Sequence, residues 1–436
     1  MSFPEPQRTE TVDQHEEGGD PGQGPPPPSL SARRIVGLIA AVIGGAMVFL
    51  TCAGGPLVMT SFLIQGESYR VALEQATGPL VLVLVIGTML GLEGWRIWRG
   101  RPSPNFYPRR LGLLAAGVLV LILIGLLLSL TDGAASFLLA PLNAVTMLLL
   151  PLLVLGGVGR LLRGRGGTWR DVLAGLMGGA TIGTGLAMVG EITLVLLVLV
   201  LAIALGLLPV DVEELESLTE QMSDPGLLLD PERLAQLITP KVVLGALAFV
   251  AVATPLMEEA VKTLWIGVAG VWLRPTPARA FLLGVASGAG FALVENVLNS
   301  AFLTSFWTVG VFSRLAATFM HCATGGLVGW GWGQLWTERR VWRWLSASVG
   351  AVVLHGAWNG LVVGTVASGL QAAGNPEDLA AVTTSGLAAT VMLLTLLLLA
   401  AGTLVGLLWV SRRLGRHEPV PEPAPAGEVQ DDTSTV

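Results

Sequence analysis

The sequence is poor in charged residues, which make up 13% of its 436 positions, whereas hydrophobic residues make up 52%. A soluble globular protein carries roughly 25% charged residues, so this composition excludes water as the solvent for most of the chain. The stretches 111–130 and 137–157 carry no charge, and each is long enough to cross a bilayer core of about 30 Å as a helix. The sequence therefore predicts an all-α fold, a polytopic transmembrane helical bundle.

Cysteine and lysine are also scarce. The two cysteines, Cys52 and Cys322, lie in apolar segments, which argues against a disulfide framework. Only Lys241 and Lys262 are lysines among the 25 basic residues, a usage that we interpret as typical of GC-rich bacterial genomes. The net charge of −6 gives no support for nucleic-acid binding. We expect a multi-pass protein of a bacterial inner membrane whose partners are the lipid bilayer and membrane-anchored proteins.

About ten crossings are predicted between two polar tails. They lie near residues 35–55, 77–95, 111–130, 137–158, 172–209, 242–273, 281–303, 311–336, 344–366 and 380–411. Most arginines fall on one side of these crossings, so the positive-inside rule predicts that both termini are cytoplasmic.

Four regions follow from this pattern. Residues 1–33 and 412–436 are predicted to be disordered cytoplasmic tails, because they are polar and rich in proline and acidic residues. Residues 34–240 form an N-terminal membrane region of about five spans that ends in an acidic external loop at 210–240, and residues 241–411 form the core that carries the chemistry.

Two of the predicted crossings are too long for one upright span. For 172–209, a glycine-rich re-entrant or interfacial piece between Gly175 and Gly190 could precede a true span. For 242–273, Pro255 offers a natural break, because proline lacks a backbone N–H and kinks a helix.

Ionisable residues are concentrated in four consecutive spans between 242 and 366. Each such residue costs roughly 2.5–3.5 kcal/mol at the centre of a membrane helix, so its presence indicates a function. The earlier spans hold only Glu93, near a helix end, and Glu191, which we expect to be a loop or interfacial residue. The four core spans hold seven, most of them near mid-span and thus at one depth: Glu258, Glu259, Lys262, Glu295, Arg314, His321 and His355. We predict that these groups converge.

Helical spacing refines this prediction. Glu258 and Lys262 are four residues apart and share a helix face, while Glu259 points about 100° away. One carboxylate can pair with Lys262, which leaves the other for chemistry. His355 and Asn359 are also four residues apart, and the glycines beside them allow another helix to approach closely.

Four motifs, each on a separate predicted span and in this order, resemble the PrsW family of intramembrane proteases. They are Glu-Glu-x-x-Lys at Glu258, Glu259 and Lys262; Phe-x-x-x-Glu-Asn at Phe291, Glu295 and Asn296; His-x-x-x-x-Gly at His321 and Gly326; and His-x-x-Trp-Asn at His355, Trp358 and Asn359. The family is distantly similar to CAAX prenyl proteases and bacteriocin-processing membrane proteases. The resemblance implies cleavage of membrane-anchored proteins, anti-sigma-factor-like regulators among them.

The residues leave two mechanisms open. Peptide hydrolysis needs an activated water, a proton donor for the leaving amine and stabilisation of the oxyanion. In a metal-free version Glu258 or Glu259 is the general base, assisted by His321, while His355 and Asn359 donate hydrogen bonds to the oxyanion. In a zinc version His321, His355 and either glutamate hold the ion, which activates the water.

Six further residues are predicted to support the site. Lys262 and Arg314 would set the charge of the carboxylates, and Glu295 with Asn296 would orient the histidines. Phe291 and Trp358 complete the matched motifs.

Two other classes of function fit buried carboxylates and histidines. A proton-coupled transporter uses such groups as a proton relay, and would show pH-gradient-driven uptake that Glu258→Gln abolishes. A non-catalytic scaffold would use them only to hold helices together, so the same change would alter stability or partner binding but never proteolysis.

Overall fold

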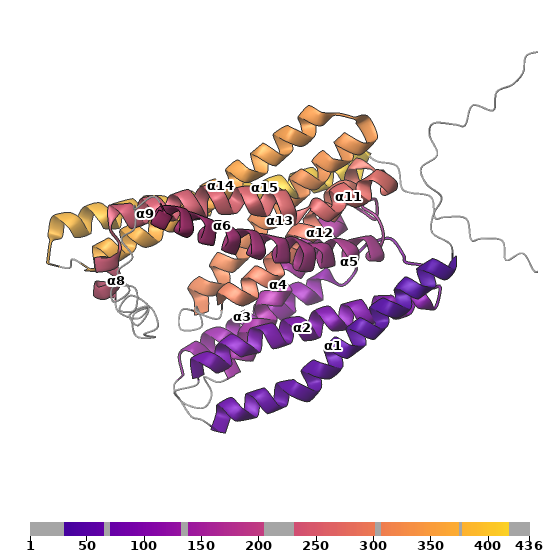
Figure 1. Ribbon diagram of the computed structural model, residues 1–436, viewed down its shortest axis with the longest axis horizontal. Helices are drawn as coiled ribbons and strands as arrows, with labels where there is room; N and C mark the ends of the chain where they lie inside the picture. The colour runs from indigo at the N-terminus through magenta and orange to yellow at the C-terminus, as the bar shows by residue number, and fades with distance from the viewer. Residues whose placement is uncertain are drawn as a thin grey trace, which may run out of the picture.

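The computed structural model describes residues 30–64, 70–131, 138–204, 231–300, 307–374 and 377–417. Within these ranges every regular element is a helix, and the one β-type contact is an isolated bridge between Asn105 and Thr168. Nine helical segments of the described chain are long and apolar enough to cross a membrane. The protein is an all-α, multi-pass membrane protein (Figure 1).

Most of both predicted tails and most of the acidic loop 210–240 lie outside the described residues. The helices nevertheless extend into both predicted tails, since the first begins at Leu30 and the last ends at His417.

The N-terminal region begins with four helices: α1 (Leu30–Ile64), α2 (Arg70–Trp98), α3 (Leu111–Ser129) and α4 (Leu139–Leu161). α1 packs against α2 along most of its length (Figure 1). Small residues permit this approach, since a Cβ added at Gly44 would collide with the backbone of Gly91. Most of α4 is buried, and it packs against α2, α3, α12 and α13.

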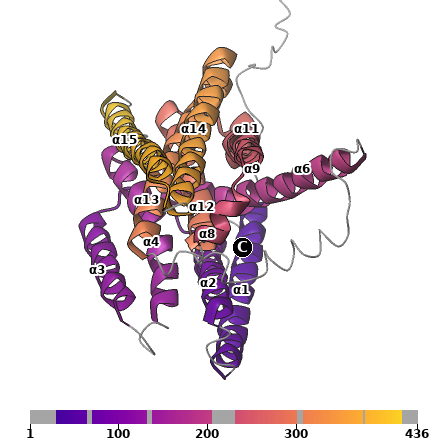
Figure 2. The same ribbon diagram turned by 90° about the vertical axis from the view of Figure 1, so that its left-hand side faces the viewer.

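The long crossing expected at 172–209 is one continuous helix rather than a re-entrant piece followed by a span. It consists of α5 (Trp169–Met177), the π-helical turn η3 (Gly178–Gly183) and α6 (Thr184–Ala204). The glycines allow η3 to pack closely against α12, because a Cβ at Gly179 would collide with the backbone of Ser287. α6 projects from the rest of the bundle in Figure 2.

The segment that carries the paired glutamates is interrupted twice. It comprises α8 (Pro231–Leu237), α9 (Pro240–Ala246), the π-helical turn η5 (Leu247–Ala253), α10 (Thr254–Lys262) and α11 (Leu264–Leu273). Pro255 lies in the first turn of α10, directly after the helical residues of η5, so its missing N–H leaves one hydrogen bond out of this helical run. Thr263 then breaks the helix with φ −109° and ψ 10°. Glu258, Glu259 and Lys262 therefore occupy one short helix between two interruptions.

Four helices complete the fold: α12 (Pro277–Ser300), α13 (Trp307–Glu338), α14 (Val341–Gly374) and α15 (Leu379–His417). α12 lies at the centre of the bundle. In its apolar 18-residue stretch 89% of the residues are buried, more than in any other candidate span of the described chain. α13 matches the predicted crossing 311–336 but is not among the nine apolar segments. It packs against α12 on one side and α14 on the other. A Cβ at Gly288 of α12 would collide with the carbonyl of His321, so α13 lies unusually close to α12.

Arginine-rich helix ends gather at one end of the bundle. The Arg170 Nε donates to Glu93 Oε1 over 2.7 Å, and Arg279 donates to Asp171 Oδ1 over 2.6 Å. These ion pairs join α2, α5 and α12. α1 begins and α15 ends toward the same, right-hand side of Figure 1. The arginine asymmetry seen in the sequence thus corresponds to one face of the bundle.

Candidate functional site

A cavity of about 510 Å³ lies among α6, α10, α12, α13 and α14. Its wall includes polar side chains from all five helices: Glu191, Glu258, Glu295, Arg314, His321, His355 and Asn359. The structure therefore brings together residues that are up to 168 positions apart, from Glu191 to Asn359. Glu259, Lys262 and Asn296 do not line this cavity and are buried behind it.

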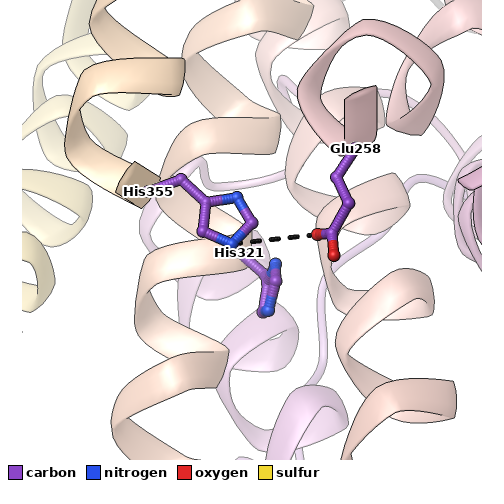
Figure 3. Close-up of side chains that lie close together, drawn as sticks. All are labelled: Glu258, His321 and His355. Atoms are coloured by element: carbon purple, nitrogen blue, oxygen red, sulfur yellow. Dashed lines mark ion pairs between the residues drawn. The ribbon is translucent and has the colours of Figure 1, made fainter. Parts of the chain in front are cut away.

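Glu258, His321 and His355 all line this cavity, and their side chains lie close together (Figure 3). Each offers a potential ligand atom, and these atoms lie within 4.8 Å of one another. His355 Nε2 is 3.8 Å from Glu258 Oε2, and the two imidazole rings are 5.1 Å apart, edge to face. All three residues are buried. Glu258 Oε2 accepts no hydrogen bond from the described residues.

Glu259 fixes the orientation of His355. Its Oε1 lies 2.8 Å from His355 Nδ1, 2.5 Å from Lys262 Nζ and 3.1 Å from the Thr324 hydroxyl, which donates to it. Because Nδ1 faces Glu259, the other ring nitrogen is turned toward Glu258. Helical spacing placed Glu258 and Lys262 on one face, but the ion pair of Lys262 forms with Glu259. Glu259 therefore positions another residue and does not face the cavity.

Both ring nitrogens of His321 have partners. Nδ1 lies 3.0 Å from Lys262 Nζ, and Nε2 contacts Glu295 Oε2. A lysine ammonium can only donate, so Nδ1 is the acceptor and Nε2 carries the proton that faces Glu295. The Phe291 ring lies 5.4 Å from the imidazole and 4.7 Å from Lys262 Nζ, in a cation–π contact. Phe291 and Glu295, from the same motif, thus hold His321 from two directions.

Glu295 is balanced by Arg314. The guanidinium donates to Glu295 Oε1 over 3.1 Å and to Asn296 Oδ1 over 3.0 Å. Asn296 donates in turn to the Thr318 hydroxyl over 3.0 Å. Asn296 was predicted to orient the histidines together with Glu295; its amide contacts Arg314, which in turn holds Glu295 beside His321.

Asn359 and Trp358 connect α14 to its neighbours. The Asn359 amide donates to the backbone carbonyl of Val250 in η5 over 2.8 Å, so part of its donor capacity is engaged. Trp358 is 5% exposed and packs with Ala317 and Met320 of α13. Both residues also line the cavity.

Glu191 is a site residue that sequence reasoning missed. It lies within α6, not in a loop, and it lines the same cavity as Glu258. Its Oε1 is buried and accepts no hydrogen bond from the described residues. The available signal was its isolation, because no other charged residue occurs between 172 and 204. A single carboxylate in the middle of a membrane span is costly to bury, and this cost by itself makes the residue a candidate for a function.

The site contains more carboxylates than cations. The carboxylates are Glu191, Glu258, Glu259 and Glu295, and the cations are Lys262 and Arg314. Lys262 pairs with Glu259 and Arg314 with Glu295, so among the described residues Glu191 and Glu258 have no lysine or arginine partner. Two carboxylates without a basic partner in a low-dielectric cavity must be neutralised, either by protonation or by a bound cation.

The side chains present fit such an ion. Two imidazoles and one carboxylate are the donor set of many catalytic zinc sites. The contact between Glu259 and His355 Nδ1 is the outer-shell arrangement that fixes a ligating histidine. His321 can join this set through Nε2 only if that nitrogen exchanges Glu295 for the metal.

Comparison with known proteins gives a family for this region. Residues 227–400 match the model of a family described as PrsW family intramembrane metalloprotease. Comparisons with curated proteins and with solved structures gave no match. The matched residues carry every polar group named above except Glu191.

Proposed function

Because residues 227–400 belong to the PrsW family of intramembrane proteases, we propose that this membrane-embedded peptidase hydrolyses membrane-anchored proteins at the Glu258–His321–His355 cluster. The observation that carries the proposal is the cluster itself: three buried, potentially ligating side chains that face one cavity. Family membership favours peptide hydrolysis over the transporter and scaffold functions that the sequence left open.

In this proposal Glu258, His321 and His355 hold a divalent metal ion, and zinc suits their donor types best. When bound, such an ion activates a water molecule and polarises the peptide carbonyl. Glu259 keeps His355 Nε2 turned toward Glu258, and Lys262 holds both Glu259 and His321 Nδ1 in place. Glu191 adds negative charge beside Glu258 and strengthens the retention of a cation.

One observation favours a metal-free version of the same activity. Both nitrogens of His321 are engaged, by Lys262 and by Glu295, so the ring as it stands offers no free lone pair. In this version Glu258 acts as the general base, and His355, whose Nδ1 proton faces Glu259, donates a hydrogen bond from Nε2 when the ring is protonated. Asn359 can add a donor from the cavity wall only through the N–H that Val250 does not take.

The substrate class follows from the position of the cavity. Its polar groups come from helices that span the membrane, so a substrate must present its peptide bond from within or beside the bilayer. We infer single-span, membrane-anchored proteins, with anti-sigma-factor-like regulators as the candidates that the family resemblance suggests. The arginine-rich face would be cytoplasmic in a bacterial inner membrane, with both termini on that side.

Metal analysis of the purified protein tests the metal-dependent form. We expect about one zinc ion per chain in the wild type. The ion should be lost in His321→Ala and in His355→Ala, and kept in Glu338→Gln, which removes a carboxylate at the end of α13 outside the cavity. Wild-type protein that lacks metal and still cleaves substrate in the presence of a chelator would contradict the metal-dependent form and favour Glu258 as the base.

A further inference from the structure

A second cavity lies at the arginine-rich end of the bundle, away from the carboxylates and histidines. Its volume is about 540 Å³, and its lining residues are Tyr107, Arg160, Leu161, Arg163, Arg412 and Arg416. Four of these six side chains are arginines, and none is acidic. The cavity is thus strongly positive.

Close packing of two helix ends builds this cavity. Gly415 of α15 is buried against α4, and a Cβ added there would collide with the carbonyl of Leu161. Arg412 and Arg416 are four residues apart and therefore share one face of α15. They meet Arg160, in the last turn of α4, at the same cavity. Three charges of one sign are in this way held together by the fold.

The fourth arginine, Arg163, lies in the turn after α4 and has a strained backbone conformation. Arg163 has φ 54°, a left-handed conformation that is uncommon for residues other than glycine. A glycine at this position would avoid the strain but would remove a guanidinium from the cavity. Backbone strain of this kind is often found at ligand sites.

Two arginines at the same end of the bundle are neutralised by carboxylates, whereas the four cavity arginines have no ion-pair partner among the described residues. Arg170 pairs with Glu93, and Arg279 pairs with Asp171. The side chains of the four cavity arginines form no ion pair with any described residue. Mutual repulsion among them would be relieved by an anion that fits between α4 and α15.

We propose that this cavity binds a phosphate group, carried by the headgroup of an anionic phospholipid. The guanidinium fork matches phosphate oxygens in two-point contacts, which favours phosphate over a simple halide. The location favours a lipid, because Arg160 and Arg412 lie at the ends of two apolar spans, Leu139–Leu161 and Leu379–Arg416. Basic pockets between such helix ends are suited to lipid headgroups.

The test uses the full-length protein in a zwitterionic detergent with three probes. These are short-chain phosphatidylglycerol, short-chain phosphatidylcholine and inorganic phosphate, and bound molecules are counted by native mass spectrometry. The test variant is Arg160→Gln with Arg412→Gln. The matched control is Arg99→Gln with Arg413→Gln, which removes the same charge from two arginines that lie over tryptophan rings outside this cavity.

We expect the wild type and the control to bind one phosphatidylglycerol in preference to phosphatidylcholine. Each arginine near an anionic headgroup contributes about a factor of five, so the test variant should bind phosphatidylglycerol about 25-fold more weakly. Thermal unfolding without lipid should show that the test variant is folded, because it loses only like-charge repulsion.

Two results would overturn the proposal. Equal weakening in the test and control variants would show that binding depends on overall charge and not on this cavity. Inorganic phosphate that binds the wild type as tightly as phosphatidylglycerol, and is lost in the test variant, would assign the cavity to free phosphate and exclude the lipid.

Discussion

The buried ion pair between Glu259 and Lys262 offers the sharpest test of how this site is held together. The side chains are 1% and 0% exposed, and their charged atoms are 2.5 Å apart. We predict that Glu259→Gln and Lys262→Met are each strongly destabilising, whereas the double variant is close to wild type in stability. The reason is that each single change leaves one charge buried without its partner.

The magnitude follows from the burial. Removal of one partner from a buried pair costs about 3–5 kcal/mol, whereas replacement of both partners by neutral groups is often close to neutral. The exposed pair of Glu338 and Arg340, with side chains 35% and 47% exposed, is the matched control. Its removal should change stability by no more than about 1 kcal/mol.

Activity should respond differently from stability. Glu259 also orients His355, and Lys262 also contacts His321 Nδ1. The loss of such outer-shell partners typically costs about 10–100-fold in activity or metal affinity. The double variant should therefore recover its stability but not its rate of cleavage.

The assay is equilibrium unfolding of purified protein in mixed micelles, analysed as a double-mutant cycle, with cleavage measured on the same samples. A coupling energy above about 2 kcal/mol is expected for the buried pair. If the two single effects add to within about 0.5 kcal/mol, the residues do not act as a buried pair, and the account of the site is refuted.

Three further predictions concern the cavity itself. Glu258→Gln should lower the cleavage rate at least about a hundredfold. The protein should stay folded, because the carboxylate accepts no hydrogen bond at Oε2 from the described residues. A cleavage rate within about tenfold of wild type would exclude the proposed role of Glu258. Glu191→Gln should shorten the retention of zinc during dialysis, since it removes charge beside Glu258, and unchanged retention would show that α6 contributes nothing to cation binding. Gly288→Leu should lower stability by about 1–3 kcal/mol and abolish cleavage, because its side chain would push α13 and His321 away from α12, whereas wild-type stability would contradict the close packing seen here.

The sequence was sufficient for the all-α membrane fold and for most of the residues that converge, Glu191 excepted. Ionisable groups are costly in a bilayer, so their concentration between 242 and 366 by itself indicates where the site lies. Depth along the membrane follows from position within a span, which is why Glu258, His321 and His355 could be expected to meet.

Contacts between helices could not be predicted in the same way. Residues three and four apart are both neighbours on a helix, so spacing allowed either glutamate to pair with Lys262, and the structure pairs it with Glu259. Spacing also gave no partner for the Asn296 amide, which contacts Arg314 beside Glu295.

Irregular helices account for the other differences. A glycine-rich stretch can either fold back as a re-entrant piece or pack closely against another helix. The sequence does not distinguish these two structures, whereas the close contact between Gly179 and Ser287 shows the second. The same continuous helix carries Glu191 into the cavity, far from the motifs in sequence.

Comparison of protein N-termini in membranes is the most direct test of peptidase activity at this cavity. Cells would express the wild type, Glu258→Gln or the control Glu338→Gln at equal levels, both at rest and under envelope stress. The account predicts new N-termini within or beside single-span proteins in the wild type and the control, and none with Glu258→Gln. Identical profiles in all three under both conditions would contradict the assignment of this cavity as a peptidase centre.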